Sequence, residues 1–331
     1  KFKELYFNTQ IQPLRKLDKN MIYSSKENFE SNNVKIEDTL FYISAKKHFE
    51  DEVPWEETSY WDIFLHESGG SIVKARQSLD VWEKLFFSIQ KRGYLSQSKI
   101  KSGFCLNCRY RAAEANQCPR CGFFNKKEDL IRNHVHDLQL SEIAVHIGQD
   151  GELYLSQGRH RLTYAKLLDI KKVFVNIIVR HKKWVDFREN IIKIANSNLG
   201  KISYPLDHID LLNIPSIYKE KSFNKLLSKL IKLEGPVLEL NSKWSFFSKK
   251  LADANFESHV HYADSDNFEF YDTLKKSQYG KYNIIKSNIF EFVDNKTSFS
   301  TVILADNISF LFDRERFTEI CHILEKIEFK L

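Results

Sequence analysis

After residue 235 the chain alternates short apolar runs with amphipathic runs, and this pattern narrows the choice of fold more than any other feature. Strands are predicted at 236–240, 258–265, 281–287 and 301–308, and helices at 244–254, 267–276 and 314–327. Strands that alternate with helices pair in parallel, so an α/β sheet is expected. The pattern stops at Leu331, where a further strand would follow, and we expect this domain to be truncated.

The middle of the chain has a different pattern. Residues 143–147 and 153–155 alternate larger apolar with smaller or more polar side chains around Asp150-Gly151, which predicts a β-hairpin. A helix is predicted from Arg159. Residues 171–181 are apolar on both faces, which predicts a central strand.

Before the hairpin, a helix is predicted over residues 79–92. Ser78 can cap it and Gly93 can end it. Residues 1–60 show no clear period, although "VPWEETSYW" has the composition of an ordered aromatic loop. A mostly helical stretch is expected over 185–232, with a linker around 200–216.

Length and charge limit the class of protein. The chain has 331 residues, which predicts two domains or one large one, and it starts at Lys1, which suggests a fragment or a processed start. A net charge of +6 permits an anionic ligand without demanding nucleic acid. No apolar run is long enough to cross a membrane, and the first 20 residues lack a signal-peptide core.

Four of the five cysteines form two C-x-x-C pairs, Cys105/Cys108 and Cys118/Cys121. Two such pairs present four thiolates in the tetrahedral arrangement that structural zinc prefers. Chance disulfides or idle cysteines are the alternative, but the double spacing favours Zn²⁺ and a reducing, cytoplasmic setting. The arginines around the pairs could contact nucleic acid, although a solvated face is favoured. Cys321 is expected in a helical core.

Cationic side chains follow Gly158 at the predicted helix start, where the helix dipole favours anions. Free N–H groups there can bind phosphate, and glycine allows close approach. We therefore predict a phosphate site formed by Gly158, Arg159, His160 and Arg161, which Arg180 and His181 could extend. A surface turn with scattered cations is the alternative, as is a solvated strand end for Arg180 and His181.

The segment "GELYLSQGRHRLTYAKLLDIKKVFVNIIVRH" resembles the ParB/sulfiredoxin-like family, and "SIQKRGYLSQ" resembles that family's earlier helix and glycine. The resemblance covers roughly residues 75–184 around the cysteine insert. It implies that the Gly-Arg-His-Arg element holds the phosphates of a nucleotide such as CTP, ATP or ADP. Sulfiredoxin has its catalytic cysteine where this chain has Arg159, so cysteine sulfinate repair is set aside. The helix-turn-helix of partition proteins has no clear equivalent.

No catalytic carboxylate follows from the Gly-Arg-His-Arg element. Glu142, Asp150 and Glu152 lie near it in the sequence, but each is more simply read as a turn or surface residue. Catalytic residues are therefore left open.

The segment starting at "GPVLELNSKWSFF" resembles a class I S-adenosylmethionine-dependent methyltransferase over residues 232–331. The resemblance places Glu239 at the acid of the glycine-rich motif and Asp264 at the acid that binds ribose. Asp306 falls in a ligand-facing loop after the fourth strand. Asn241 and Ser245 stand where the family has glycine, which puts cofactor binding in doubt; a domain kept for structure or binding is the alternative.

Together these patterns predict an α/β protein. Its parts are an N-terminal extension (1–74), a ParB/sulfiredoxin-like α+β domain (75–200) with a zinc ribbon at 102–125, a linker and helix (201–231), and a Rossmann-like methyltransferase domain (232–331). A nucleotide-binding protein is the first hypothesis. A methyltransferase whose N-terminal domain selects the substrate is the second. A non-enzymatic nucleic-acid-binding protein is the least favoured. A membrane partner is not expected.

Overall fold

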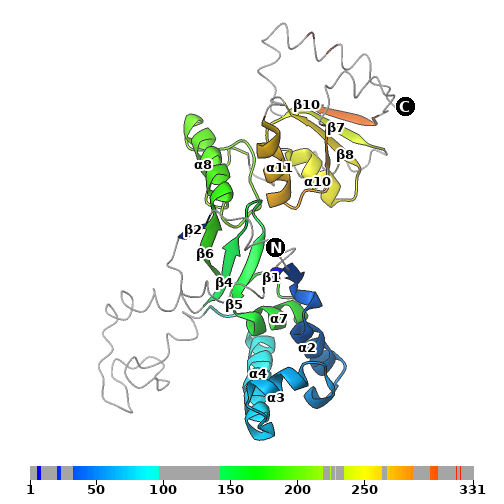
Figure 1. Ribbon diagram of the computed structural model, residues 1–331. Helices are drawn as coiled ribbons and strands as arrows, with labels where there is room; N and C mark the ends of the chain where they lie inside the picture. The colour runs from blue at the N-terminus through cyan, green and yellow to red at the C-terminus, as the bar shows by residue number, and fades with distance from the viewer. Residues whose placement is uncertain are drawn as a thin grey trace. The chain divides into compact units, whose positions relative to one another are not determined.

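The chain is an α/β protein, seen in a computed structural model (Figure 1). The structure describes residues 6–8, 21–23, 33–96, 142–218, 235–262, 267–285 and 299–304, with single positions 224, 228, 318 and 321. The chain divides into two compact units, residues 1–182 and 183–331. This division falls nearer the N-terminus than the boundary at residue 200 that the sequence suggested. Among the described residues, no helix has the length and apolarity to cross a membrane.

Unit 1 is built on a six-stranded mixed sheet. The strands lie in the order β2 (Met21–Tyr23), β6 (Val175–His181), β4 (Ile143–Ile147), β5 (Leu153–Gln157), β1 (Tyr6–Asn8) and β3 (Asn33–Lys35). β4 and β5 pair antiparallel, which confirms the predicted hairpin, and Gly151 has the positive φ that its turn requires. β6 has a strand on each side, as its apolar faces predict.

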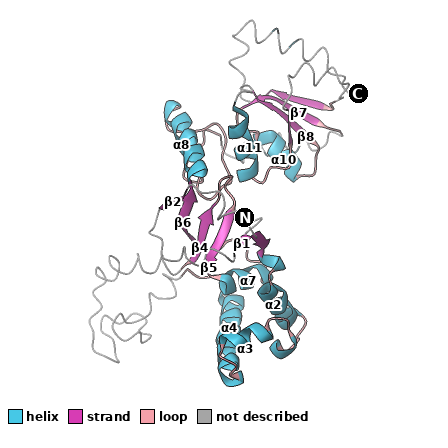
Figure 2. Cartoon of the chain, viewed as in Figure 1, coloured by secondary structure: helices cyan, strands magenta, loops and turns pink. Residues whose placement is uncertain are grey.

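Helices of unit 1 lie together beside the sheet (Figure 2). They are α2 (Leu40–Glu50), α3 (Trp61–Glu67), α4 (Ile72–Arg92) and α7 (Arg159–Leu167), with the short 3-10 turns η2 (Ile36–Asp38) and η3 (Trp55–Glu57). α4 ends at Gly93 as predicted, but it begins at Ile72, more than one turn before the predicted cap Ser78. Ser71 is its N-cap and accepts the Lys74 N–H at 3.4 Å.

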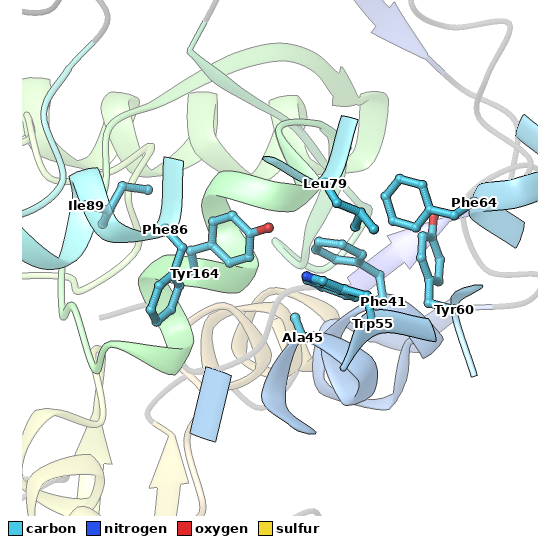
Figure 3. Packing of buried hydrophobic residues seen from close by; sticks show 9 residues of the cluster. All are labelled: Phe41, Ala45, Trp55, Tyr60, Phe64, Leu79, Phe86, Ile89 and Tyr164. Carbon is cyan, nitrogen blue, oxygen red and sulfur yellow. The ribbon is translucent and has the colours of Figure 1, made fainter. Parts of the chain in front are cut away.

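The aromatic cluster joins the N-terminal segment to α4 and α7 (Figure 3). Its buried members are Phe41, Ala45, Trp55, Tyr60, Phe64, Leu79, Phe86, Ile89 and Tyr164. Phe41 contacts Trp55 and Tyr60 with ring centroids 6.3 and 5.2 Å apart. Burial of this many rings makes the N-terminal segment an integral part of unit 1.

Unit 2 carries a parallel sheet of four strands in the order β10 (Thr301–Leu304), β7 (Val237–Ser242), β8 (Ser258–Tyr262) and β9 (Asn283–Ile284). α10 (Phe246–Asp253) joins β7 to β8, and α11 (Phe268–Ser277) joins β8 to β9. The parallel pairing confirms the predicted α/β alternation. β8 and β10 flank β7 on opposite sides, which makes the carboxyl end of β7 a topological switch point.

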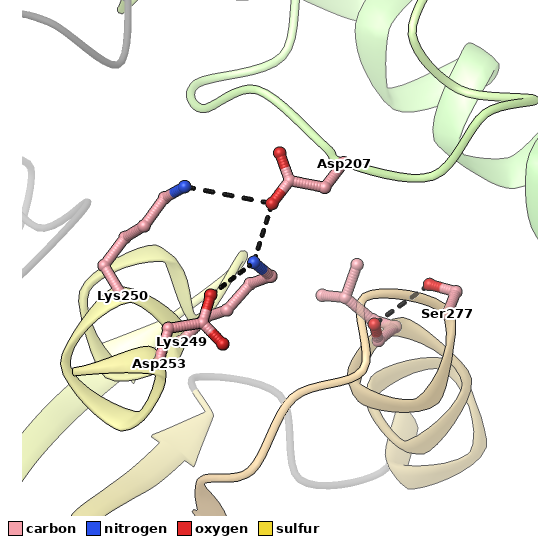
Figure 4. A network of polar contacts seen from close by, with 6 residues as sticks. Asp207, Lys249, Lys250, Asp253 and Ser277 are labelled. Carbon is pink, nitrogen blue, oxygen red and sulfur yellow. Dashed lines mark hydrogen bonds and ion pairs between the residues drawn. The ribbon is translucent and has the colours of Figure 1, made fainter. Parts of the chain in front are cut away.

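The segment 201–218 lies against α10 in unit 2. Tyr204 stacks on Phe246 with ring centroids 4.9 Å apart. The Lys249 ammonium, 5% exposed, donates to Asp207 at 2.6 Å and to Asp253 at 3.2 Å (Figure 4). Both carboxylates compensate for the burial of this charge, so the pKa of Lys249 stays above its usual value despite desolvation.

The segment 201–218 also contacts α8 (Lys182–Ser197). The Trp184 indole N–H donates to the Asp210 carboxylate at 3.0 Å, and the Trp184 and His208 rings lie 4.2 Å apart. Phe187 of α8 also contacts Phe270 of α11, with centroids 5.1 Å apart. α8 is therefore part of the packing of unit 2.

Candidate phosphate and cofactor sites

Gly158 joins β5 directly to α7. Its φ of +92° lies in the left-handed region that side chains rarely adopt. A Cβ here would lie 2.9 Å from Ile143 Cγ1 and 3.1 Å from Ile143 Cα. Both the backbone conformation and the close approach to β4 therefore require glycine at this strand–helix junction.

The start of α7 lacks the usual acidic compensation. The first bond of the helix runs from the Leu162 N–H to the Gly158 carbonyl at 3.0 Å. The N–H groups of residues 159–161 precede it and have no acceptor within the helix itself. No acidic residue lies in the first turn. The positive end of this helix is thus combined with cationic side chains, which suits an anion.

Arg159 is held by the N-terminal segment. Its Nη2 donates to the Tyr60 hydroxyl at 2.7 Å. Its guanidinium carbon lies 5.3 Å from the centre of the Phe41 ring and 5.5 Å from that of Tyr60. These contacts are cation–π interactions in a partly buried setting. Arg159 therefore takes part in packing, a role that the spacing of the motif did not indicate.

His160 packs among the same rings. Its imidazole lies 3.7 Å from Trp82 and 4.7 Å from Phe41, measured between ring centroids. Burial, together with the charges of Arg159 and Arg161, lowers its pKa to about 3. The ring is neutral at physiological pH, so its position favours packing over the predicted role as a phosphate ligand.

Arg161 is placed differently from its two neighbours. It lines a small cavity of about 30 Å³ together with Leu85, Ser88, Ile89, Arg92, Gly93, Tyr94 and Leu95. That volume exceeds the roughly 10–15 Å³ that an ordered water needs. Arg161 comes from α7, while the other lining residues come from the C-terminal end of α4 and the turn after it. The cavity therefore lies between the C-terminal end of α4 and the first turn of α7, two segments that are far apart in the sequence.

Polar groups at this cavity have unused hydrogen-bonding capacity. Within the described residues, neither Arg161 Nη1 nor the Tyr94 hydroxyl makes a hydrogen bond of good geometry, although Arg161 and Glu142 lie close enough to this hydroxyl to influence its pKa. Nη1 lies 3.9 Å from Glu142 Oε2, an ion-pair distance. Burial raises the pKa of Tyr94 to about 12, so this hydroxyl stays a neutral donor. A cation and a neutral hydroxyl that retain donor capacity suit an oxyanion.

Other predicted members of the phosphate site lie elsewhere on the sheet. Gln157, just before Gly158, pairs with Ala144 at the start of β4. Arg180 pairs with Ile147 at the opposite end of β4. Three residues of strand separate these positions by about 10 Å along β4. The register therefore does not bring Arg180 and its neighbour His181 to Gly158, which corrects that part of the predicted site.

Of the nearby carboxylates, Glu142 lies 3.9 Å from Arg161 Nη1. Asp150 and Glu152 belong to the turn between β4 and β5, at the far end of the hairpin from Gly158. There the Asp150 N–H donates to Glu152 Oε2 at 3.1 Å. This contact supports their interpretation as turn residues.

In unit 2, Glu239 lies at the predicted position in β7 but is fully buried. Its Oε1 accepts the Ser242 hydroxyl at 2.7 Å, and its Oε2 accepts the Ser248 N–H at 2.7 Å. Ser242 Oγ in turn accepts the N–H groups of Ser245 at 2.8 Å and Trp244 at 3.3 Å. The acid of the motif therefore caps its own helix, α10.

Several predicted residues cannot be placed. Cys105, Cys108, Cys118 and Cys121 lie outside the described residues, as do Asp264 and Asp306, and so does the side chain of Asn241. Elsewhere, the described part of the chain has no group of three or more metal-ligating side chains. The zinc site and the ribose acid remain predictions. Cys321 is a free, partly buried cysteine.

Comparisons with known proteins give little guidance. No family model and no curated protein matches the chain. It is similar to a co-crystal structure of WbdD and the kinase inhibitor LY294002, with 15% identity and a TM-score of 0.31. The match covers 41% of this chain and 33% of that chain, so it spans about a third of the WbdD chain. A likeness this weak carries no argument about fold or function.

Proposed function

We propose that unit 1 binds a phosphorylated ligand at the start of α7, with a nucleotide such as CTP, ATP or ADP as the expected class. The nucleotide follows from the resemblance to ParB/sulfiredoxin-like proteins. The observation that carries the proposal is the position of Arg161. This cation lines a cavity beside an uncompensated helix start, and its Nη1 makes no hydrogen bond within the described residues.

In this proposal the ligand forms hydrogen bonds with the polar groups at the cavity and at the start of α7. Phosphate oxygens accept from Arg161, from the Tyr94 hydroxyl and from N–H groups of the first turn of α7. Arg159 and His160 contribute through packing, because their side chains contact Tyr60, Phe41 and Trp82. One of the three motif side chains thus contacts the ligand directly.

Calorimetric titration of the full chain with CTP, ATP, ADP and inorganic phosphate tests the proposal. Arg161→Gln should weaken binding roughly 10- to 100-fold, since a hydrogen-bonded charge is lost. Arg159→Gln is the matched control, because it makes the same change of charge at the first residue of the same helix. It should change affinity less than about threefold while lowering the melting temperature.

Circular dichroism of each variant shows whether it is folded before titration. The proposal fails if no phosphate compound binds the wild-type chain. It also fails if folded Arg161→Gln binds as tightly as wild type, or if the two variants lose affinity equally.

We propose separately that the four paired cysteines hold one structural Zn²⁺. The support is the double C-x-x-C spacing. Metal analysis of the purified chain should find one zinc per molecule, and Cys118→Ser should reduce that content. Cys321→Ser is the control and should leave zinc content unchanged.

A further inference from the structure

The loop between β7 and α10 stands where the methyltransferase resemblance expects a cofactor. Ser245, the N-cap of α10, has φ 52° and ψ 31°, a left-handed conformation. Glycine in such a position leaves room for a ligand next to the backbone. Ser245 instead has a side chain here, and this residue is 0% exposed.

Three N–H groups of this loop and of the first turn of α10 are already bonded. Ser242 Oγ accepts from Trp244 and Ser245, and Glu239 accepts from Ser248. Ser242 and Glu239 are also bonded to each other. A carboxylate at the positive end of a helix provides the compensation that an anionic ligand would otherwise provide.

The hydroxyl of Ser245 is bonded as well. It contacts the Tyr262 hydroxyl, which lies 3.4 Å from that of Tyr282. Tyr262 also stacks on Tyr271 with ring centroids 3.7 Å apart, which fixes its position. Burial raises the pKa of Tyr262 well above 10 and that of Tyr282 to about 12, so both are neutral hydrogen-bonding groups.

We infer that this loop is closed by its own side chains and that unit 2 does not bind S-adenosylmethionine there. Approach of the cofactor requires displacement of Ser245 and Tyr262 from a fully buried, hydrogen-bonded network. The described residues of this loop do not fit the cofactor that the resemblance implies. The network instead stabilises the junction between β7 and α10.

Melting temperatures of the cofactor-free full chain test the network. Loss of a buried acceptor should lower the melting temperature of Ser242→Ala by roughly 4–8 °C, and Tyr262→Phe should lower it by a smaller amount. Ser277→Ala is the control: this buried serine bonds only the Leu274 carbonyl in its own helix, at 3.0 Å (Figure 4). It should change the melting temperature by less than about 2 °C. If Ser242→Ala and Tyr262→Phe are neutral or stabilising, as expected for ligand-binding residues, the inference fails.

Addition of millimolar S-adenosylmethionine gives the second readout. The wild-type melting temperature should not rise, because a ligand stabilises only the state that binds it. A rise that persists in Arg161→Gln overturns the inference. A rise that Arg161→Gln abolishes places the adenosine compound in unit 1 and agrees with a closed loop in unit 2. These outcomes are separate from the phosphate titrations, which test the site of unit 1.

Discussion

The N-terminal ends of α7 and α10 have similar backbone geometry, but different groups surround their N–H groups. Each follows a strand through a residue in the left-handed conformation, Gly158 before α7 and Ser245 before α10. The first turn of α7 has cations and no acid, whereas Glu239 and Ser242 bind the N–H groups at the start of α10. The same backbone geometry therefore leaves one helix start suited to an anion and the other filled.

The largest expected difference between the two junctions concerns the left-handed residue itself. Gly158→Ala adds backbone strain and a Cβ contact of 2.9 Å, and should destabilise unit 1 by about 2–4 kcal/mol. Ser245→Ala keeps the Cβ that is already present and loses one hydrogen bond, which should cost about 1 kcal/mol. Urea unfolding measures both free energies. Equal losses would show that the close packing around Gly158 is not a constraint.

The acidic cap of α10 gives the next comparison. Glu239→Gln removes a buried charge that accepts from Ser242 and Ser248, so unfolding free energy should fall by about 2 kcal/mol. Urea unfolding of Glu142→Gln, whose carboxylate lies 3.9 Å from Arg161, provides the control and should show a smaller loss. A stabilised Glu239→Gln would mean that this acid is kept for a ligand, and the two helix starts would then be alike.

The pH dependence of stability tests whether His160, in the first turn of α7, is buried as a neutral side chain. Its pKa is about 3 in the folded chain and 6.5 when unfolded, so the unfolded state binds more protons in this range. Stability should therefore fall as pH drops from 6.5 toward 3, by about 1.4 kcal/mol per pH unit, or about 2 kcal/mol at pH 5.

His160→Phe keeps an aromatic ring between Phe41 and Trp82 and removes the titration. Unfolding free energies from pH 7 to 5 should decline less steeply in this variant. His146 and His261, whose pKa values burial lowers to about 4, stay in both proteins, so the difference isolates His160. Parallel pH profiles would show that His160 is accessible to protons in the folded state.

The smallest expected effect tests the assignment of Arg159 to packing. Tyr60→Phe removes the hydroxyl that accepts from Arg159 but keeps the ring, so stability should fall by about 1 kcal/mol. Affinity for phosphate compounds should stay within about threefold of wild type. A tenfold loss of affinity would assign Arg159 to the ligand site and weaken the contrast with Arg161.

Local patterns predicted much of this fold. The β4–β5 hairpin, Gly158, α7 and the parallel strands of unit 2 all follow from side-chain alternation and turn residues. The strands β1, β2 and β3 have three residues each, too few to show a period, and they join the sheet through pairing with distant segments. The start of α4 was misplaced because Ser71 and Ser78 are equally good caps by composition.

Sites were harder to predict because their partners lie far apart in the sequence. Tyr60 and Arg159 are separated by 99 positions, so the motif could not show that Arg159 is engaged. The aromatic richness of "VPWEETSYW" was the available signal. In unit 2, serines at 242, 245 and 248 follow Glu239 at regular spacing, which is a hint of a capped helix start. Only the fold brings Tyr262 to that loop.

The contacts of Lys249 determine where a stable fragment containing unit 2 can begin. A fragment that starts at residue 232, where the methyltransferase resemblance begins, lacks Asp207 and Tyr204. It uncovers the face of Phe246 and leaves a buried ammonium with Asp253 as its remaining carboxylate. A fragment that starts at residue 183 keeps both contacts and the Trp184–Asp210 hydrogen bond. The compact unit is therefore longer than the domain, residues 232–331, that the sequence predicted.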